Sequence, residues 1–143
     1  MRQDDIAQDQ TFETGHTVPL TATVAGNKIK ISGNGGADLK QNSGAHRFDF
    51  TLASPPGVAV QFASLDTEDN CSTCPPASGE NSKQIVGVQI GSNTASFTDN
   101  NNNKVAMDVS YQWNFTCNDS RYQVEPFDPI IKNGGTTTPP GGG

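Results

Sequence analysis

The sequence lacks a long apolar run and a basic cluster. Residues 1–16, MRQDDIAQDQTFETGH, contain no stretch of signal-peptide length, and no later segment is long enough to span a membrane. We therefore expect neither a secretion signal nor a membrane anchor in the chain as given, although removal of a leader would allow an extracellular location. The net charge of −6 and the absence of a run of Lys and Arg predict that the protein binds neither nucleic acid nor an anionic membrane.

Motifs of catalysis are also scarce. His16 and His46 are the two histidines, and no Gly-x-Ser-x-Gly sequence is present to form a nucleophile elbow. In a regular strand His46 and Asp49 point to opposite faces, so they would not form a catalytic pair. The glycine-rich segment GNGGADLKQNSG lacks the spacing of a phosphate-binding loop. The sequence thus predicts a protein that is not an enzyme, with no catalytic residue and no cofactor.

Turn-forming residues are abundant, and they favour short strands over long helices. The 143 residues include 15 Gly and 9 Pro, and only 32% are hydrophobic, a balance that is typical of strands joined by tight turns. The length fits one domain with a single core. We expect a flexible segment at residues 1–11, one β-sandwich domain at 12–132 and a flexible Gly/Pro-rich tail at 133–143.

The clearest pattern is the alternation of apolar and polar residues in VAMDVSYQWNFTC, residues 105–117. A period of two predicts a strand that turns one face to the core and the other to water. The apolar face comprises Val105, Met107, Val109, Tyr111, Trp113 and Phe115, and Cys117 extends it as a small hydrophobic residue. A strand of this length is expected to contain a bulge or a bend.

Shorter runs of strand-like composition follow at regular intervals along the rest of the chain. They occupy residues 17–24, 28–32, 46–52, 58–62, 84–90 and 121–125. Together these runs predict an all-β fold, an antiparallel β-sandwich of about seven to eight strands that is immunoglobulin-like or jelly-roll-like. Pro19 marks the first of them as an edge strand or an irregular one.

Turn chemistry indicates which strands should be neighbours. The turn residues 54–57, Ser-Pro-Pro-Gly, lie between residues 46–52 and 58–62, so we expect those two strands to pair antiparallel. Asp99–Asn103 is expected to form the tip of a hairpin that leads into residues 105–117, because Asp and Asn tolerate the left-handed backbone of tight turns.

Cys71 and Cys74 form a Cys-x-x-Cys motif in a long polar loop, residues 66–82. Redox catalysis needs a lowered thiol pKa, and the acidic residues just before the motif disfavour a thiolate. A structural zinc site needs four ligands, of which this motif supplies two. We therefore expect a local disulfide or a reduced, inert pair, with Cys117 as a separate thiol.

The same loop contains oxygen ligands of the kind that calcium prefers. They belong to four residues, Asp66, Glu68, Asp69 and Asn70. The loop is not an EF-hand, because it lacks the glycine and the terminal glutamate of that motif. The alternative to a calcium site is an acidic loop that is simply hydrated.

The carboxy-terminal third combines an Asn-rich hairpin, an alternating strand with Ser110 and Tyr111, and the closing sequence FDPIIKN. In these features the chain resembles small bacterial β-sandwich proteins of unknown function known as the DP-EP family. The matching positions of the closing sequence are Asp128, Pro129, Ile130 and Asn133. The resemblance implies a β fold and no catalytic residue.

Asp128 and Pro129 form a turn element, because Asp can accept hydrogen bonds from the following backbone and Pro has a fixed φ. Ile130 and Ile131 can then anchor the end of the domain, up to Asn133, against the sandwich. We expect this segment to be a local latch. The alternative is a docking strand for another chain.

These features predict a non-catalytic interaction or accessory module, with loops at one end of the sandwich as its contact surface. Its partner would be another protein or further copies of the same chain. One alternative is a structural subunit of an extracellular or virion-like assembly, joined through flexible ends or an edge strand. Another is a metal or redox protein that uses Cys71 and Cys74.

Overall fold

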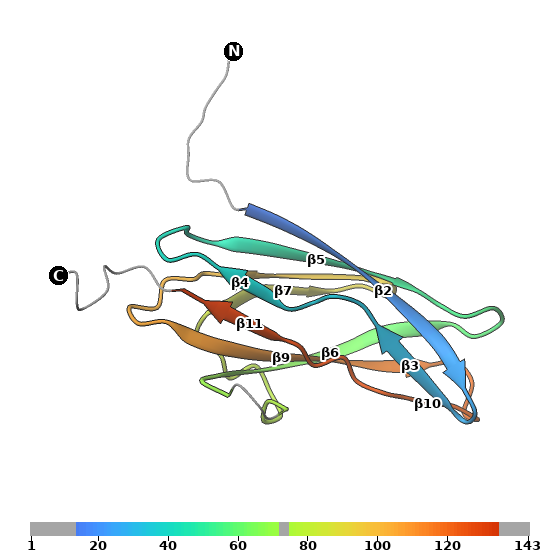
Figure 1. The fold of residues 1–143 in the computed structure, drawn as a ribbon. Coiled ribbons are helices and arrows are strands. Elements are labelled where there is room, and N and C mark those ends of the chain that lie inside the picture. Colours follow the sequence, from blue (N-terminus) through green and yellow to red (C-terminus); the bar gives the residue numbers. More distant parts are fainter. Residues whose placement is uncertain (1–13, 72–74, 135–143) are drawn as a thin grey trace, which may run out of the picture.

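The computed structural model describes residues 14–71 and 75–134 (Figure 1). All regular elements in this part of the chain are β-strands, which confirms the all-β prediction. One sheet has six strands in the order β10-β3-β2-β5-β8-β7, and the other has four in the order β4-β11-β9-β6. The predicted flexible segment 1–11 lies outside the described residues, as does the predicted tail from residue 135 onward.

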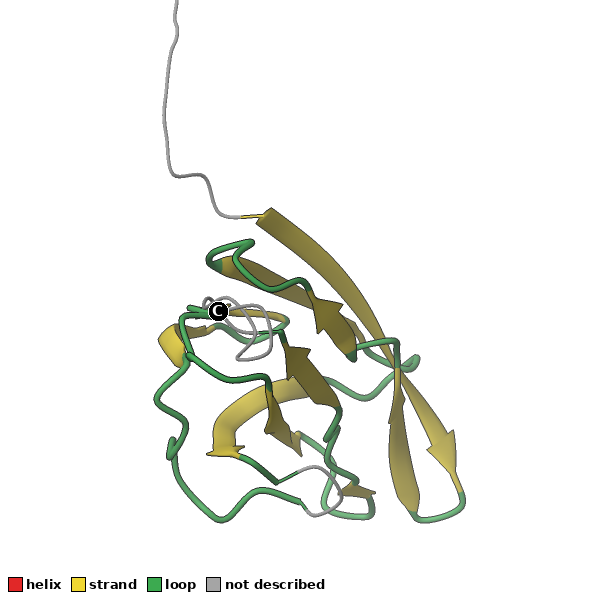
Figure 2. Ribbon diagram, turned by 60° about the vertical axis from the view of Figure 1, so that its left-hand side comes forward, coloured by secondary structure: helices red, strands yellow, loops and turns green. Residues whose placement is uncertain are grey.

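The strands of the six-stranded sheet are β2 (Thr14–Ala25), β3 (Lys28–Ser32), β5 (His46–Ala53), β7 (Ile85–Ile90), β8 (Thr94–Asp99) and β10 (Gln123–Val124). Those of the four-stranded sheet are β4 (Ala37–Leu39), β6 (Val60–Asp69), β9 (Met107–Cys117) and β11 (Ile130–Asn133). Figure 2 shows the larger sheet curling around the core.

Both sheets are mixed, so the predicted antiparallel sandwich is wrong in this respect. β2 and β3 are antiparallel and joined by a tight turn at Gly26, where φ is +65°. β5, in contrast, runs parallel to β2. Between β3 and β5 the chain crosses to the four-stranded sheet, where it forms β4. It then re-enters the six-stranded sheet as β5, which runs in the same direction as β2. β10 with β3 and β11 with β4 are the further parallel pairs among the described strands.

The two pairings predicted from turn chemistry are also wrong. β5 belongs to the six-stranded sheet, whereas β6, the strand that follows it, belongs to the four-stranded sheet. β8 and β9 are separated in the same way. A turn sequence favours a reversal of the chain, but it does not decide whether the next strand joins the same sheet or the opposite one.

Pro19 lies in the interior of the six-stranded sheet by strand order, yet it has a neighbouring strand on one side only. β5 pairs with residues 14–21 of β2, while β3 pairs with residues 21–25. At Pro19 the sheet therefore ends at β2, and the missing N–H of proline breaks no ladder there. The predicted edge position is correct for this part of the strand.

The two sheets enclose one core, which contains most of the large aromatic side chains. Phe50 of β5 lies edge-on to Trp113 of β9, with ring centroids 5.4 Å apart, and Phe97 of β8 lies edge-on to Tyr111 at 5.0 Å. Val109, Tyr111 and Trp113 have no exposed surface, which confirms the centre of the core face predicted for residues 105–117. Val105, which the same alternation assigns to that face, is 70% exposed, because β9 begins only at Met107. The bulge predicted within residues 105–117 is found instead in the partner strand β6, where the register shifts between Phe62 and residue 64.

Candidate functional site

Three of the predicted calcium ligands, Asp66, Glu68 and Asp69, belong to β6 and not to a loop, and they hold the following loop against this strand. Asp66 accepts a hydrogen bond from the Gly79 amide at 2.8 Å, and Glu68 accepts one from the Ala77 amide at 2.8 Å. Asp69 accepts one from the Ser82 hydroxyl at 2.6 Å and one from the amide of residue 83 at 3.0 Å. These hydrogen bonds tie residues 77–83 to the end of β6.

Asn70, the fourth predicted ligand, is exposed and has a left-handed backbone with φ of +63°. Its amide donates to the carbonyl of Asp108 at 2.7 Å. Among the residues that the structure describes, no three His, Cys, Asp or Glu side chains come together in a group that could hold a metal ion.

Two of the three cysteines, Cys71 and Cys117, lie in the described part of the chain. Cys71 is buried, and its carbonyl accepts a hydrogen bond from Ser110 of β9. Cys74 lies outside the described residues, so the disulfide remains a prediction. Cys117 is a free, half-buried thiol that packs against the core, as the strand pattern predicts.

Thiol counting tests the predicted disulfide. Alkylation of the denatured protein without reductant is expected to modify one thiol, Cys117, and alkylation after reduction should modify all three. Intact-mass measurement separates these states. Three modified thiols before reduction would show that Cys71 and Cys74 are a reduced pair. Because the loop between them is so short, reduction should change the free energy of unfolding only slightly.

The two histidines contact each other, which the sequence analysis did not predict. His16 Nε2 lies 2.8 Å from His46 Nδ1, and His46 Nε2 lies 2.9 Å from the Ser43 hydroxyl. Asp49 is not part of this group and pairs with Arg47 instead. Burial lowers the pKa of both histidines, and the charge of His16 lowers that of His46 further.

The chain of contacts from Ser43 to His46 to His16 resembles the arrangement of a nucleophile, its base and a group that orients the base. The hydrogen bonds, however, indicate a structural role. The Ser43 hydroxyl donates to the Lys40 carbonyl at 2.6 Å and accepts from the Asn101 amide at 3.1 Å. His46 Nε2 must then donate to Ser43, so it is protonated and is not available as a base. The network stabilises the turn at residues 40–45.

The predicted latch is an internal strand of the four-stranded sheet. β11 is hydrogen-bonded to β4 on one side and to β9 on the other, and Ile131 is fully buried. Just before it, Phe127 exchanges two hydrogen bonds with Trp113, at 2.8 and 3.1 Å. Both edges of β11 are therefore occupied by strands of the same chain. Asn133, placed by the sequence at the start of the tail, is its last residue.

A buried polar group, here called the Asp99 cluster, lies where β8 and β11 end. It consists of Asp99, Asn101, Asn103 and Asn133. Asp99, Asn101 and Asn133 are 0–1% exposed, and Asn103 is 9% exposed. Asn133 Nδ2 donates to Asp99 Oδ1 at 2.8 Å and to Asn103 Oδ1 at 3.1 Å. Asp99 Oδ1 also accepts from the Asn101 backbone amide at 2.9 Å.

The pKa of the Asp99 carboxyl group is higher than that of an exposed aspartate. Burial raises its pKa to about 6, and the nearby charge of Asp69 acts in the same direction, although the hydrogen bonds from Asn133 and Asn101 oppose the shift. The sequence predicts Asp99, Asn101 and Asn103 at the tip of a hairpin and Asn133 in the latch segment. The Asp-x-Asn-x-Asn spacing of residues 99–103 is the signal by which the cluster could have been noticed.

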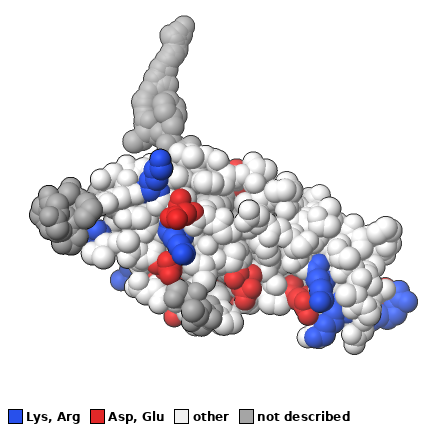
Figure 3. Space-filling view, viewed as in Figure 1, with Lys and Arg blue, Asp and Glu red and all other residues white. Residues whose placement is uncertain are grey.

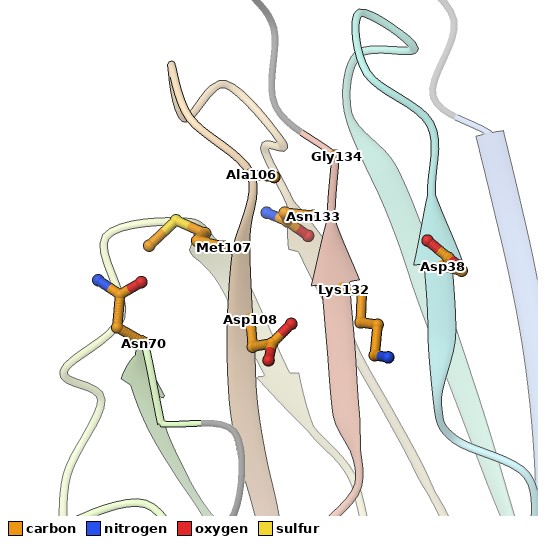
Figure 4. Close-up of a pocket in the computed structure, with 8 residues that line it drawn as sticks. All are labelled: Asp38, Asn70, Ala106, Met107, Asp108, Lys132, Asn133 and Gly134. Carbon is orange, nitrogen blue, oxygen red and sulfur yellow. The ribbon is translucent and has the colours of Figure 1, made fainter. Parts of the chain in front are cut away.

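A pocket of about 490 Å³ opens at the same end of the molecule, on the outer face of the four-stranded sheet (Figure 4). Three charged side chains from adjacent strands line it, Asp38 of β4, Lys132 of β11 and Asp108 of β9. The strand register places Lys132 directly between the two carboxylates. None of the three forms an ion pair with any described residue.

Fold and site together define an all-β protein of two mixed sheets, with a charged pocket and a buried polar cluster at one end. No model of a known protein family matches the chain, and no curated protein matches it. Among the described residues there is no helix that could cross a membrane.

Proposed function

We propose that this protein is a non-catalytic interaction module that binds an extended, charged segment of another protein in the pocket over β4, β11 and β9. The observation that carries the proposal is the unpaired row of Asp38, Lys132 and Asp108. Figure 3 shows acidic and basic side chains alternating over these strands.

Charge complementarity indicates what the segment looks like. Neighbouring strands are about 4.8 Å apart, and alternate residues of an extended peptide, which share one face, are about 6.6 Å apart. A peptide with basic, acidic and basic residues at alternate positions would place each charge within reach of one pocket residue. Asn70 and Met107 flank the row and would supply polar and apolar contacts.

Exposed charges of this kind contribute more to specificity and to the rate of association than to affinity. The pocket is therefore suited to recognition with moderate affinity. The proposal keeps the interaction module predicted from the sequence, but it places the contact surface on strands β4, β9 and β11 instead of on loops at one end.

Selection from a random peptide display library on the immobilised protein tests this proposal. We expect enrichment of peptides in which basic and acidic residues alternate. Asp108→Lys should weaken binding of a selected synthetic peptide by about tenfold, a free energy of about 1.4 kcal/mol. Glu80→Lys, an equal change of charge at an exposed carboxylate outside the pocket, should leave binding unchanged.

Absence of enrichment, or equal losses in the two variants, would overturn the proposal. Light scattering of the purified protein at several concentrations examines the other candidate occupant, a second copy of the chain. An increase in mass that Asp108→Lys abolishes and Glu80→Lys does not would assign the pocket to self-association and support the structural-subunit alternative.

A further inference from the structure

The Asp99 cluster has more hydrogen-bond acceptors than donors. Three of its buried oxygen atoms, Asp99 Oδ2, Asn101 Oδ1 and Asn133 Oδ1, have no hydrogen-bond partner. Buried polar atoms in native proteins are nearly always paired, and each unpaired one costs about 1–3 kcal/mol. Three in one cluster indicate a missing positive charge or donor.

The orientations of the amides are determined by their neighbours. Asn101 Nδ2 donates to the Lys40 carbonyl at 3.2 Å and to the Ser43 hydroxyl at 3.1 Å, so its oxygen must point the other way. Asn103 Nδ2 donates to the Val105 carbonyl at 2.8 Å, which identifies its Oδ1 as an acceptor. If either side-chain amide were rotated by 180°, its oxygen would face the backbone carbonyl oxygen that now accepts its hydrogen bond.

Asn133 is oriented by the same reasoning. Its Nδ2 faces two acceptors, Asp99 Oδ1 and Asn103 Oδ1, so its oxygen is the atom left over. Asp99 Oδ2 and Asn133 Oδ1 each lie only the width of one carboxyl or amide group from their 2.8 Å hydrogen bond. Two of the unpaired oxygens therefore belong to side chains that are joined directly by a hydrogen bond, and the third belongs to Asn101, whose backbone amide donates to Asp99 Oδ1.

We propose that the Asp99 cluster binds one calcium ion. Calcium takes about six to eight carboxylate, carboxamide, carbonyl and water oxygens at about 2.3–2.6 Å in flexible geometry. The side-chain oxygens of the cluster are of these kinds, and three of them are unpaired. Magnesium demands octahedral geometry and retains several waters, which suits a water-excluded cluster poorly. Zinc prefers nitrogen and sulfur ligands, and both ring nitrogens of the nearby His46 are already engaged.

The electrostatics of the cluster favour a cation. Asp99 carries the one carboxylate among its four residues, and its charge is removed from water. Asp69, which raises the pKa of Asp99, adds a second negative charge nearby. A bound divalent cation would offset both charges and would pair with the amide oxygens at the same time.

Calorimetric titration of the full chain with CaCl2, after removal of metal with EGTA, tests the site. We expect one ion per chain and a melting temperature that rises with calcium concentration. Asp99→Asn should raise the dissociation constant at least tenfold. Asp49→Asn removes an equal charge from the outer face of β5 and should leave the affinity unchanged. MgCl2 should bind at least tenfold more weakly than CaCl2.

The stability of the variants separates loss of the site from loss of the fold. In EGTA, Asp99→Asn should melt at the same temperature as the wild type or higher, because it removes a buried negative charge that forms no ion pair with a described residue. Asn101→Gly gives a second test, since glycine accepts the φ of +47° at this position. It should also raise the dissociation constant at least tenfold.

Three outcomes would overturn the proposal. They are an absence of heat and of stabilisation at millimolar CaCl2 in the wild type, an unchanged affinity in folded Asp99→Asn, and equal affinities for calcium and magnesium. Unchanged affinity in the variant would instead indicate the acidic residues at the end of β6, which the sequence also identifies as candidate ligands. None of these outcomes depends on the peptide pocket, so either proposal can fail alone.

Discussion

Trp113→Ala is expected to lower the free energy of unfolding by about 3–5 kcal/mol, as large truncations in a packed core do. Trp113 has no exposed surface and contacts aromatic rings from both sheets. Its ring centroid lies 5.4 Å from that of Phe50 and 5.1 Å from that of Phe62, both edge-on, and 6.1 Å from the stacked Phe97. The substitution would leave a cavity between the two sheets. It would break no side-chain hydrogen bond, because Trp113 Nε1 has no partner.

Gln112→Ala is the matched control on the same strand. Gln112 points away from the core, where its side chain donates to Asn114 at 2.7 Å. Its loss should cost less than about 1 kcal/mol, the usual range for a partly exposed hydrogen bond. Urea unfolding followed by circular dichroism measures both variants. Equal destabilisation would contradict the assignment of the two faces of β9.

The second large effect is a fall in stability with rising pH that is due to Asp99. Because the pKa of its carboxyl is about 6 in the folded protein and about 3.9 in an unfolded chain, the folded state binds the proton more tightly. Stability from this group is therefore greatest below about pH 4, falls between about pH 4 and 6, and stays low above that range. A shift of about 2 pH units corresponds to about 3 kcal/mol.

His16 and His46 act in the opposite direction over part of the same range. Their lowered pKa values mean that the unfolded state binds protons more readily, so their contribution to stability rises as the pH increases toward neutrality. The measurement is therefore a comparison of wild type with Asp99→Asn in EGTA, by urea unfolding at several pH values from 4 to 7. The difference between the two should grow with pH, in favour of the variant. A constant difference would show that Asp99 does not titrate in this window.

The strand β9 shows what local pattern can determine. Side chains of a strand alternate between two faces, so the spacing of Val109, Tyr111 and Trp113 is enough to predict a buried face without knowledge of any partner strand. The boundaries of β3 and the position of Pro19 at a local edge follow from equally local properties. These predictions succeed because the information lies within a few consecutive residues.

The pairing of the strands could not be obtained in this way. β2 and β5 are parallel neighbours, although about twenty residues separate them in the sequence and the chain forms a strand of the other sheet in between. The turns after β5 and β8 have the composition of hairpin turns but carry the chain from one sheet to the other. Which sheet receives a strand depends on how the apolar faces of all strands fit into one core, and that is a property of the whole chain.

The sequence by itself determined that the chain is all-β, which face of β9 is buried and where short turns fall, because these depend on backbone preference and on alternation. The tertiary structure alone decided the candidate sites. Asp99 and Asn133 are 34 residues apart, and they meet because β8 and β11, in different sheets, end at the same end of the molecule. Asp38, Lys132 and Asp108 form a row only because β11 inserts between β4 and β9. Long-range strand order sets these contacts, and no local pattern encodes it.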